Sequence, residues 1–252
     1  MAYTICTLAD RPDLEPQIDR LSRAAWPSFL LHGNTHHWHL LFEMFAEYQL
    51  LICEPADVVI AVGHCVPLTW DGQAQDLPDT IDEIIRRAKQ TRLSGGAPNT
   101  FSALAAMVDP NRRGQNLSQA VVLAMRALAH SNGCASLIAP VRPTWKSRYP
   151  LTPMERYVTW RRPDGAPLDP WVRVHWRLGA EQVRVALNTL TVEGTIDDWQ
   201  GWTGIAFPES GAYVVPGALQ PVTMDCERNV GHYEDPNIWM RHGTSPEEGS
   251  RQ

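Results

Sequence analysis

The stretch Ala105-Ala106-Met107-Val108-Asp109-Pro110-Asn111-Arg112-Arg113-Gly114-Gln115-Asn116-Leu117-Ser118 decides the fold of this chain. Its apolar first residues predict a buried strand that ends at Val108, and Asp109-Pro110 opens a turn. A short basic loop follows, and a helix is expected to start near Ser118. Loop amides and a helix N-terminus then meet at one point. This arrangement predicts an anion site, because the first N–H groups of a helix have no partners within it.

The residues of this loop resemble the acyl-CoA-binding core of the GCN5-related N-acetyltransferases (GNAT). The signature of that family, Arg/Gln-x-x-Gly-x-Gly/Ala, falls on Arg113-x-x-Asn116-x-Ser118, so both glycine positions are changed. Asn tolerates left-handed backbone angles and Ser starts helices well, so the loop can still form. The motif continues with a helix, Gly133 and a strand over 135–140. The alternative is a strand-turn-helix unit of any α/β protein, with its arginines merely solvated.

The resemblance implies an α/β fold with a mixed, mostly antiparallel central sheet flanked by helices. It is expected to cover residues 1–190, with residues 191–252 as a C-terminal extension packed on it and a flexible tail from about residue 243. Hydrophobic periodicity places the elements along the chain. Strands are expected over 3–8, 50–53, 58–68, 100–108, 135–140, 181–185, 189–192, 212–215 and 221–226, and helices over 15–25, 35–48, 81–88, 118–132, 170–178 and 195–203.

Composition and charge indicate a soluble, cytoplasmic protein with a basic site. Hydrophobic residues make up 44% and charged residues 20% of the 252 residues, which is typical of a globular domain. No signal peptide or membrane segment is expected, and the 5 scattered cysteines predict buried thiols rather than disulfides. Residues 101–162 carry a net charge of +7, so the rest of the chain carries −13. This segment suits a ligand with several phosphates, although a solvated basic face or an RNA partner stays open.

The donor implied by the resemblance is acetyl-CoA or another acyl-CoA, bound as a co-substrate without a metal. Its phosphates are expected on the basic loop and on arginine and lysine after the next strand, and its arm along residues 100–108 by strand addition. The backbone N–H of Met107 or Val108 would meet the oxyanion. The expected donor-binding residues are Met107, Val108, Arg112, Arg113, Gly114, Gln115, Asn116, Leu117, Ser118, Arg142 and Lys146.

Two histidines are the candidate catalytic residues. His175 falls at the position of the family's late tyrosine, whose hydroxyl protonates the leaving thiolate, and an imidazole with a pKa near neutrality can donate that proton. The strand over 100–108 carries no carboxylate, so the acceptor amine would lose its proton through a water or through His64. For both histidines a structural role is the alternative.

The acceptor site is expected under the second helix and at the loop after residue 140. His36, His37, Trp38 and Tyr149 are its candidate residues. The histidines between residues 32 and 39 also suggest a metal site, but no nearby Cys, Asp or Glu completes a ligand set, so surface or acceptor-pocket roles are preferred.

These observations predict an acyltransferase that moves an acyl group from a thioester to the amine of a small molecule. Two rival hypotheses remain. One keeps the fold and takes an aminoacyl-tRNA or a carrier-protein thioester as donor, which the basic segment would suit. The other is a non-catalytic acyl-CoA-binding module. No membrane partner is expected, and a homodimer is left open.

Overall fold

The computed structural model describes residues 3–245. Within these residues, one nine-stranded sheet runs through the molecule in the order β1-β2-β3-β4-β5-β9-β8-β7, with β6 on the other edge of β9. Neighbouring strands are antiparallel except β4 and β5, which are parallel. The strands are β1 (Thr4–Thr7), β2 (Gln49–Glu54), β3 (Val58–Leu68), β4 (Thr100–Val108), β5 (Ser136–Val141), β6 (Glu181–Gly194), β7 (Gly211–Tyr213), β8 (Val222–Asp225) and β9 (Val230–Gly243).

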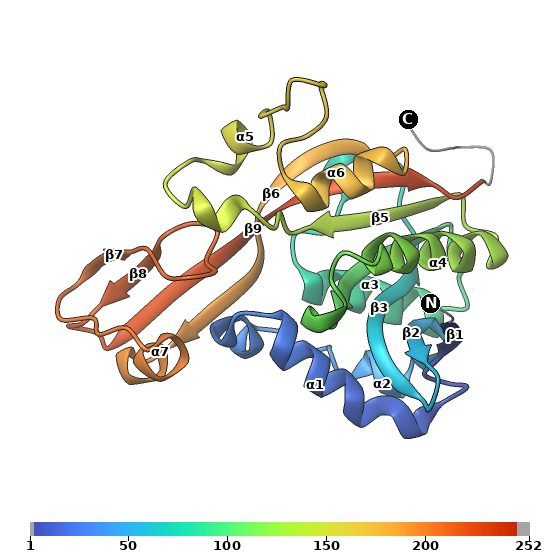
Figure 1. Ribbon diagram of the computed structural model, residues 1–252, viewed down its shortest axis with the longest axis horizontal. Helices are drawn as coiled ribbons and strands as arrows, with labels where there is room; N and C mark the ends of the chain where they lie inside the picture. The colour runs from blue at the N-terminus through green and yellow to red at the C-terminus, as the bar shows by residue number, and fades with distance from the viewer. Residues whose placement is uncertain (1–2, 246–252) are drawn as a thin grey trace.

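Helices cover both faces of this sheet (Figure 1). Leu51 and Trp239 pack on the face that α1, α2 and α3 cover, whereas Leu50 and Ile238 pack on the face that α4, α5 and α6 cover. None of the helices in the described part of the chain is long and apolar enough to cross a membrane. The α-helices are α1 (Glu15–Ala25), α2 (Leu40–Glu43), α3 (Ile81–Leu93), α4 (Leu117–Ser131), α5 (Met154–Tyr157), α6 (Pro170–Arg177) and α7 (Ile196–Thr203).

β4 and β5 separate like the arms of a V. They pair only over residues 100–102 and 136–138, after which β4 continues along β3 and β5 continues along β9. β4 also carries a bulge, because His64 pairs with Ala105 and Cys65 with Ala103, which leaves Leu104 without a partner. Because pairing with β5 stops at residue 102, the edge of β4 that faces β5 is open beyond that point.

The strand β9, which joins the two ends of the molecule, was not expected from the sequence. β6 pairs with β9 along most of the length of β9, β8 pairs with the start of β9, and β5 pairs with the end of β9. Pro236 removes an N–H from the ladder and interrupts the pattern that predicts a strand. It fits because the register shifts between Ala186 and Leu190 of β6, opposite this proline. The same bulge explains why one strand, β6, replaces the two that were expected.

The expected boundary at residue 190 falls inside β6, and β9 comes from the expected extension. β7, β8 and α7 project at the left of Figure 1 around a core of their own, which includes Trp199 and Tyr233. Whether residues 1–190 form a separate domain stays a prediction. The expected tail begins within β9, which reaches Gly243, and its residues 246–252 lie outside the described part.

The second expected helix is much shorter than predicted. α2 spans four residues, and the chain on either side of it forms turns. The aromatic residues of this segment still pack inward, with Phe45 completely buried. Its approach to the sheet is fixed by α3, where Asp82 accepts hydrogen bonds from the backbone N–H of His37 (2.7 Å) and from its ring Nδ1 (2.7 Å).

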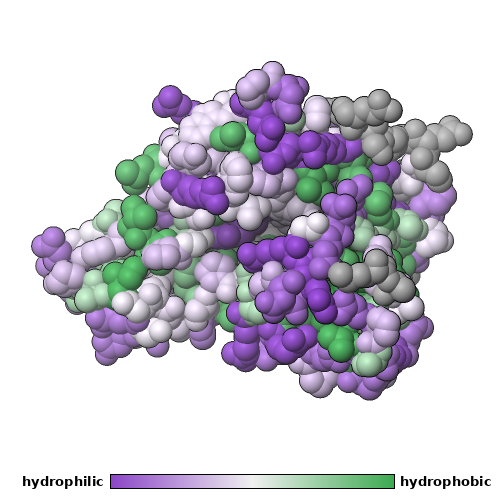
Figure 2. Space-filling model, in the orientation of Figure 1, coloured by the Kyte–Doolittle hydropathy of each residue, from purple (hydrophilic) through white to green (hydrophobic). Residues whose placement is uncertain are grey.

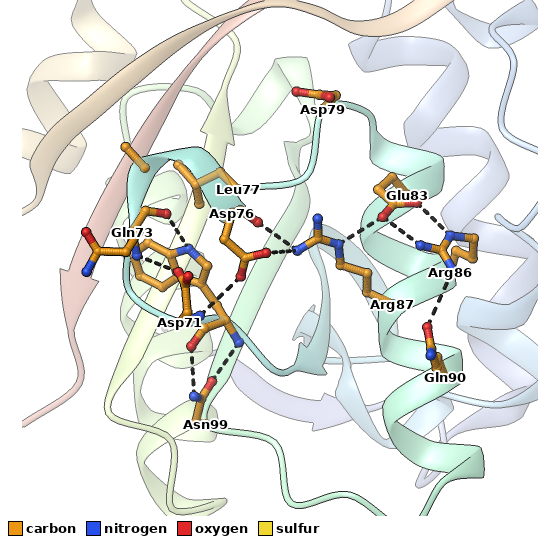
Figure 3. A network of polar contacts seen from close by, with 12 residues as sticks. Asp71, Gln73, Asp76, Leu77, Asp79, Glu83, Arg86, Arg87, Gln90 and Asn99 are labelled. Atoms are coloured by element: carbon orange, nitrogen blue, oxygen red, sulfur yellow. Dashed lines mark hydrogen bonds and ion pairs between the residues drawn. The ribbon is translucent and has the colours of Figure 1, made fainter.

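A polar network holds the loop between β3 and α3 (Figure 3). Arg87 of α3 donates to the carbonyl of Asp76 (2.7 Å) and to its carboxylate (2.9 Å). The Glu83 carboxylate accepts hydrogen bonds from both Arg86 and Arg87, and these contacts lower the pKa of the carboxyl to about 2. From β6, Arg184 donates to the carbonyl of Leu77 (2.9 Å). The network ties α3 and β6 to the loop that precedes α3.

Candidate active site

A cavity of about 880 Å³ lies where β4 and β5 separate. Its walls come from α1, the 3-10 helix η2 (Ser28–His32), β4, the start of α4, β5, α6 and β9. In the space-filling view this face is hollowed between α1 and the α5–α6 region, with hydrophilic side chains around the hollow (Figure 2). The cavity therefore reaches from one face of the sheet to the other through the opening of the V.

The loop after β4 brings the N-terminus of α4 to this cavity. Gly114 (φ +81°) and Asn116 (φ 58°) adopt left-handed backbone angles, so an asparagine occupies a position that favours glycine. The Asn116 side chain makes no capping hydrogen bond to the helix. The first amides of α4 therefore have no side-chain acceptor, and Asn116, Leu117 and Ser118 all line the cavity. A helix start without a cap can bind an anion.

The two adjacent arginines of the loop have different surroundings. Arg112 donates from Nη2 to Glu54 Oε2 (2.7 Å), which neutralises it. Arg113 is exposed and has no ion pair with any residue between 3 and 245. Both line the cavity. Arg113 is therefore the guanidinium that a phosphate group can engage without breaking an existing pair.

Gln115 and Lys146 do not line the cavity, although both were expected to bind the donor. Gln115 is exposed on the outer side of the loop. Lys146 is buried, and its Nζ donates to the carbonyls of Tyr149 and Leu219. Burial lowers the pKa of this ammonium to about 8. These hydrogen bonds join the loop after β5 to the loop before β8, so the side chain has a structural role.

Arg142 lines the cavity, but on the face of the sheet opposite α4. Its Nε donates to both carboxylate oxygens of Asp235 (3.0 and 2.9 Å), and its Nη2 donates to the carbonyl of Gly217 (2.8 Å). Asp235 projects from β9 on the same side as Trp239, which packs with α2 and α3. Arg142 therefore belongs to the wall opposite the phosphate loop rather than to the loop itself.

His175 projects from α6 and lines the cavity. Its Nδ1 lies 2.8 Å from Nε2 of His242 on β9, and its own Nε2 is buried with no hydrogen-bond partner among residues 3–245. Burial, with a smaller contribution from His242, lowers the pKa of His175 well below its ordinary value. The expected pKa near neutrality is wrong for this reason, and the imidazole is neutral at physiological pH.

The position of α6 depends on a buried carboxylate. Asp169 caps the helix by accepting hydrogen bonds from the amides of Trp171 (2.9 Å) and Val172 (3.1 Å). It also accepts from the amide of Trp145 (2.7 Å) and from the hydroxyl of Tyr157 (2.9 Å). Because one carboxylate joins α6, α5 and the loop after β5, the helix that carries His175 is fixed at its start.

His64, the other candidate base, does not line the cavity. Its side chain is completely buried between Trp38 and Phe42, and its Nδ1 bonds Gln49 Oε1 (2.8 Å). Burial lowers the pKa of His64 to about 4. The residue fills the bulge of β4 and β3, so it reaches an acceptor amine only if its aromatic neighbours move.

Of the four expected acceptor residues, only Trp38 lines the cavity. His36 is exposed, His37 is bonded to α3, and Tyr149 packs edge-on against Trp160 (ring centroids 5.0 Å apart). The histidine cluster is dispersed by the turns around α2. In the described part of the chain, no group of three or more His, Cys, Asp or Glu side chains is placed to hold a metal ion.

The chain is 33% identical over 273 residues to the arginine N-acetyltransferase avaD of Aspergillus versicolor, and the match covers 95% of this chain and 93% of that relative. The chain belongs to the GNAT superfamily. No protein-family model matches it. This membership confirms the acyl-CoA-dependent N-acyltransferase predicted from residues 105–118, acting on a small amine.

Solved structures with this GNAT fold match nearly the whole chain. The loading GNATL domain of CurA from Lyngbya majuscula has a TM-score of 0.66 at 14% identity and covers 97% of this chain and 98% of its own. The GNAT-like decarboxylase GphF, solved in complex with isobutyryl-CoA, has a TM-score of 0.58 at 13% identity, with coverage of 97% and 100%. At these identities the likeness confirms the predicted fold class.

The far end of the cavity in this GNAT protein is closed by residues that were not expected from the sequence. Asp235 and Asn237 of β9 line it, because every second residue of that strand faces the same side. His32 of η2 also lines it and stacks on Trp202 of α7 (4.3 Å, 10° between ring planes). The apolar run over 238–240 was the available local signal for this strand, and the polar residues around Pro236 do not extend it.

Proposed function

We propose that the protein transfers an acetyl group from acetyl-CoA to the α-amine of arginine or of a close guanidino analogue. One observation carries this proposal. A single cavity joins the uncapped start of α4 to the wall formed by η2 and β9, through the gap between β4 and β5. A thioester donor and an amine acceptor can therefore enter from opposite faces of the sheet and meet at its centre.

The donor fits the α4 side of the cavity. Its pyrophosphate accepts from the first amides of α4, and Arg113 supplies a free positive charge. The pantetheine arm lies along the open edge of β4, where unpaired backbone groups and the small side chains of Ala103, Ala105 and Ala106 allow close approach. The acyl carbonyl then lies near the end of β4, where the N–H of Met107 or Val108 can stabilise the oxyanion.

The reaction breaks the C–S bond of the thioester and forms a C–N bond to the acceptor. The amine loses one proton to water in the cavity, and the departing thiolate takes up one proton from water to leave as the neutral thiol. We assign His175 to this sulfur. A neutral imidazole with its proton on Nε2 donates a hydrogen bond to the thiolate, and its Nδ1 then accepts from Nε2 of His242 (2.8 Å). His242 would so fix the donating tautomer.

The acceptor assignment rests on the relative whose name specifies arginine and on the chemistry of arginine. Its guanidinium stays protonated at physiological pH, so the α-amine is the nitrogen that can attack the thioester. The match to that relative covers nearly the full length of both chains, which includes every wall of the cavity.

The first test is calorimetric titration of acetyl-CoA into nucleic-acid-free protein, followed by thiol release with arginine. We expect saturable binding and arginine-dependent release of coenzyme A. Arg113→Glu should weaken acetyl-CoA binding about 10- to 100-fold, because it replaces a charge-assisted contact with repulsion. Arg228→Glu is the matched control, since it makes the same charge change at an exposed residue outside the cavity. Equal affinities of the two variants would reject the phosphate-loop assignment.

The two rival hypotheses from the sequence stay predictions, and the same experiment separates them. Acetyl-CoA binding without turnover on any amine would favour a non-catalytic binding module. Folded protein that binds no acetyl-CoA would favour an aminoacyl-tRNA or a carrier-protein thioester as donor. Steep salt dependence and co-purifying RNA would then point to tRNA.

A further inference from the structure

The acceptor wall of the cavity contains two buried oxygen-bearing side chains, Asp235 and Asn237. They lie two residues apart on β9, and therefore project to the same face of the sheet. Asp235 is 2% and Asn237 is 3% exposed, and both line the cavity. Acceptor-rich side chains this deeply buried need hydrogen-bond partners, so each of their oxygens must be accounted for.

The orientation of the Asn237 amide follows from its neighbour on β6. The hydroxyl of Thr189 donates its single proton to the carbonyl of Asp235 (3.0 Å). Its oxygen can then only accept, so the Asn237 atom that contacts it must be Nδ2. Oδ1 of Asn237 is therefore the opposite atom of the amide. It is buried and has no hydrogen-bond partner among residues 3–245.

The Asp235 carboxylate keeps spare capacity of the same kind. Its Oδ1 accepts from the hydroxyl of Tyr233 (2.6 Å) and from Arg142 Nε. Within residues 3–245, Oδ2 accepts only from that same Nε (2.9 Å). A carboxylate oxygen can accept two hydrogen bonds, so Oδ2 has one position left. The wall thus offers two neighbouring acceptors, one of them charged.

We propose that Oδ1 of Asn237 and Oδ2 of Asp235 bind the guanidinium group of the acceptor. This inference rests on the proposed function and names the part of the cavity that selects the acceptor. A guanidinium presents several N–H donors in one plane, which matches two acceptors held side by side on a strand. With its guanidinium on β9, the α-amine of the acceptor extends toward the end of β4, where the thioester is placed.

The charge balance of the wall favours a hydrogen-bonding group over a bare cation. Arg142 already offsets the charge of Asp235, so the pair is close to neutral. An apolar side chain in the same position would leave Oδ1 of Asn237 and the free position of Oδ2 unpaired, which is costly in a buried site. The site should therefore prefer arginine strongly over an amino acid of similar length without N–H donors.

The test compares arginine with norleucine, which keeps the α-amine and replaces the guanidino group with a methyl-terminated chain. We expect the wild-type kcat/KM to favour arginine by about 100-fold or more. Asn237→Leu, and the smaller Asn237→Ala, should lower kcat/KM for arginine about 10- to 100-fold and leave norleucine within about threefold. Asn188→Leu is the control, because it removes an amide from β6 that does not line the cavity. Acetyl-CoA affinity reports whether each variant is folded.

Four outcomes separate this inference from the proposed function. If arginine is acetylated and the preference for arginine over norleucine collapses in both Asn237 variants, the proposed function and the inference are both supported. Turnover with an unchanged preference overturns the inference and leaves the function standing. If arginine is not acetylated, binding of arginine that is lost in the variants keeps the site and rejects the reaction. Absence of both turnover and arginine binding in folded protein overturns both.

Discussion

The two ends of the cavity are built in different ways. The donor end comes from one continuous stretch, because the end of β4, the basic loop and the start of α4 are consecutive in the chain. The acceptor end is assembled from η2, the bulge of β6, the loop before β8 and the middle of β9, which are separated by up to about two hundred residues.

This difference shows where the specificity of each end resides. In the proposed donor site, backbone amides and Arg113 would contact the donor, and the loop forms with Asn116 and Ser118 in place of small residues. Side chains from distant elements form the acceptor end, and each is held by others, as Arg142 is held by Asp235 and Gly217. Changes at the first end should alter donor affinity alone, and changes at the second should alter acceptor selection alone.

The largest effect is expected where the two ends meet. His175→Phe removes the hydrogen bond to the leaving sulfur and keeps a ring of similar size in the buried position. We expect kcat to fall about 100-fold or more, with acetyl-CoA affinity unchanged within about twofold. Steady-state kinetics together with calorimetric titration measure the two quantities separately. Equal turnover of variant and wild type would remove His175 from the mechanism.

Acid should destabilise the folded protein through two buried histidines, one on each face of the sheet. Burial lowers the pKa of His64, under the aromatic residues near α2, and of His242, beside α6, to about 4. In the unfolded chain both take up a proton as the pH falls through about 6.5, whereas the folded protein resists until about pH 4. The unfolded state therefore binds more protons in this window, and stability falls with falling pH.

Each histidine should lower the free energy of unfolding by about 2–3 kcal/mol between pH 7 and pH 4.5. Urea unfolding at the two pH values measures the loss. His64→Gln should reduce the loss by the contribution of one histidine, with His36→Gln as the control because His36 is exposed. If wild type and His64→Gln lose the same free energy of unfolding between the two pH values, the assignment of His64 as buried and neutral is wrong.

Local sequence patterns were sufficient for several elements around the cavity, including those of the proposed donor end. The bounds of α1, β3 and β4, the Asp169 cap and the left-handed angle of Asn116 follow from periodicity and from residue chemistry within a few positions. The shape of the basic loop is predictable for the same reason, because its amides and its arginine belong to one stretch, whereas its binding of phosphate stays a proposal. The sequence could not show that Arg112 pairs with Glu54 and that Arg113 stays free.

The acceptor end could not be read in this way. β9 breaks its own pattern at Pro236, and that proline is accommodated only by a bulge in β6, which lies more than forty residues earlier. Lys146 and Arg142 looked like phosphate ligands because they are basic and close in sequence to β5. Burial against Leu219 and pairing with Asp235 decide their roles, and both partners come from distant segments.

The acceptor end should respond to a change in α7 that the donor end does not detect. Trp202 stacks on His32, and the amide of Asn34 just beyond η2 bonds the carbonyl of Thr191 (2.8 Å). Trp202→Ala removes the stack, and we expect KM for the acceptor to rise about three- to tenfold. Acetyl-CoA affinity should stay unchanged. Trp145→Ala, which lies outside the cavity, controls for loss of a tryptophan. An equal rise in the acceptor KM of both variants would show that α7 has no specific role in acceptor binding.

The smallest effect is expected at the donor end, at Asn116. Its φ of 58° costs little for Asn and nothing for Gly, so Asn116→Gly should change stability by no more than about 0.5 kcal/mol and acetyl-CoA affinity by no more than about threefold. Asn116→Val forces a β-branched residue into the same backbone angle and should cost about 1–2 kcal/mol, because its side chain clashes there. Thermal unfolding and calorimetric titration measure both variants. If Gly and Val behave alike, the left-handed turn is not what positions the first amides of α4, and the donor end would then depend on side chains as the acceptor end does.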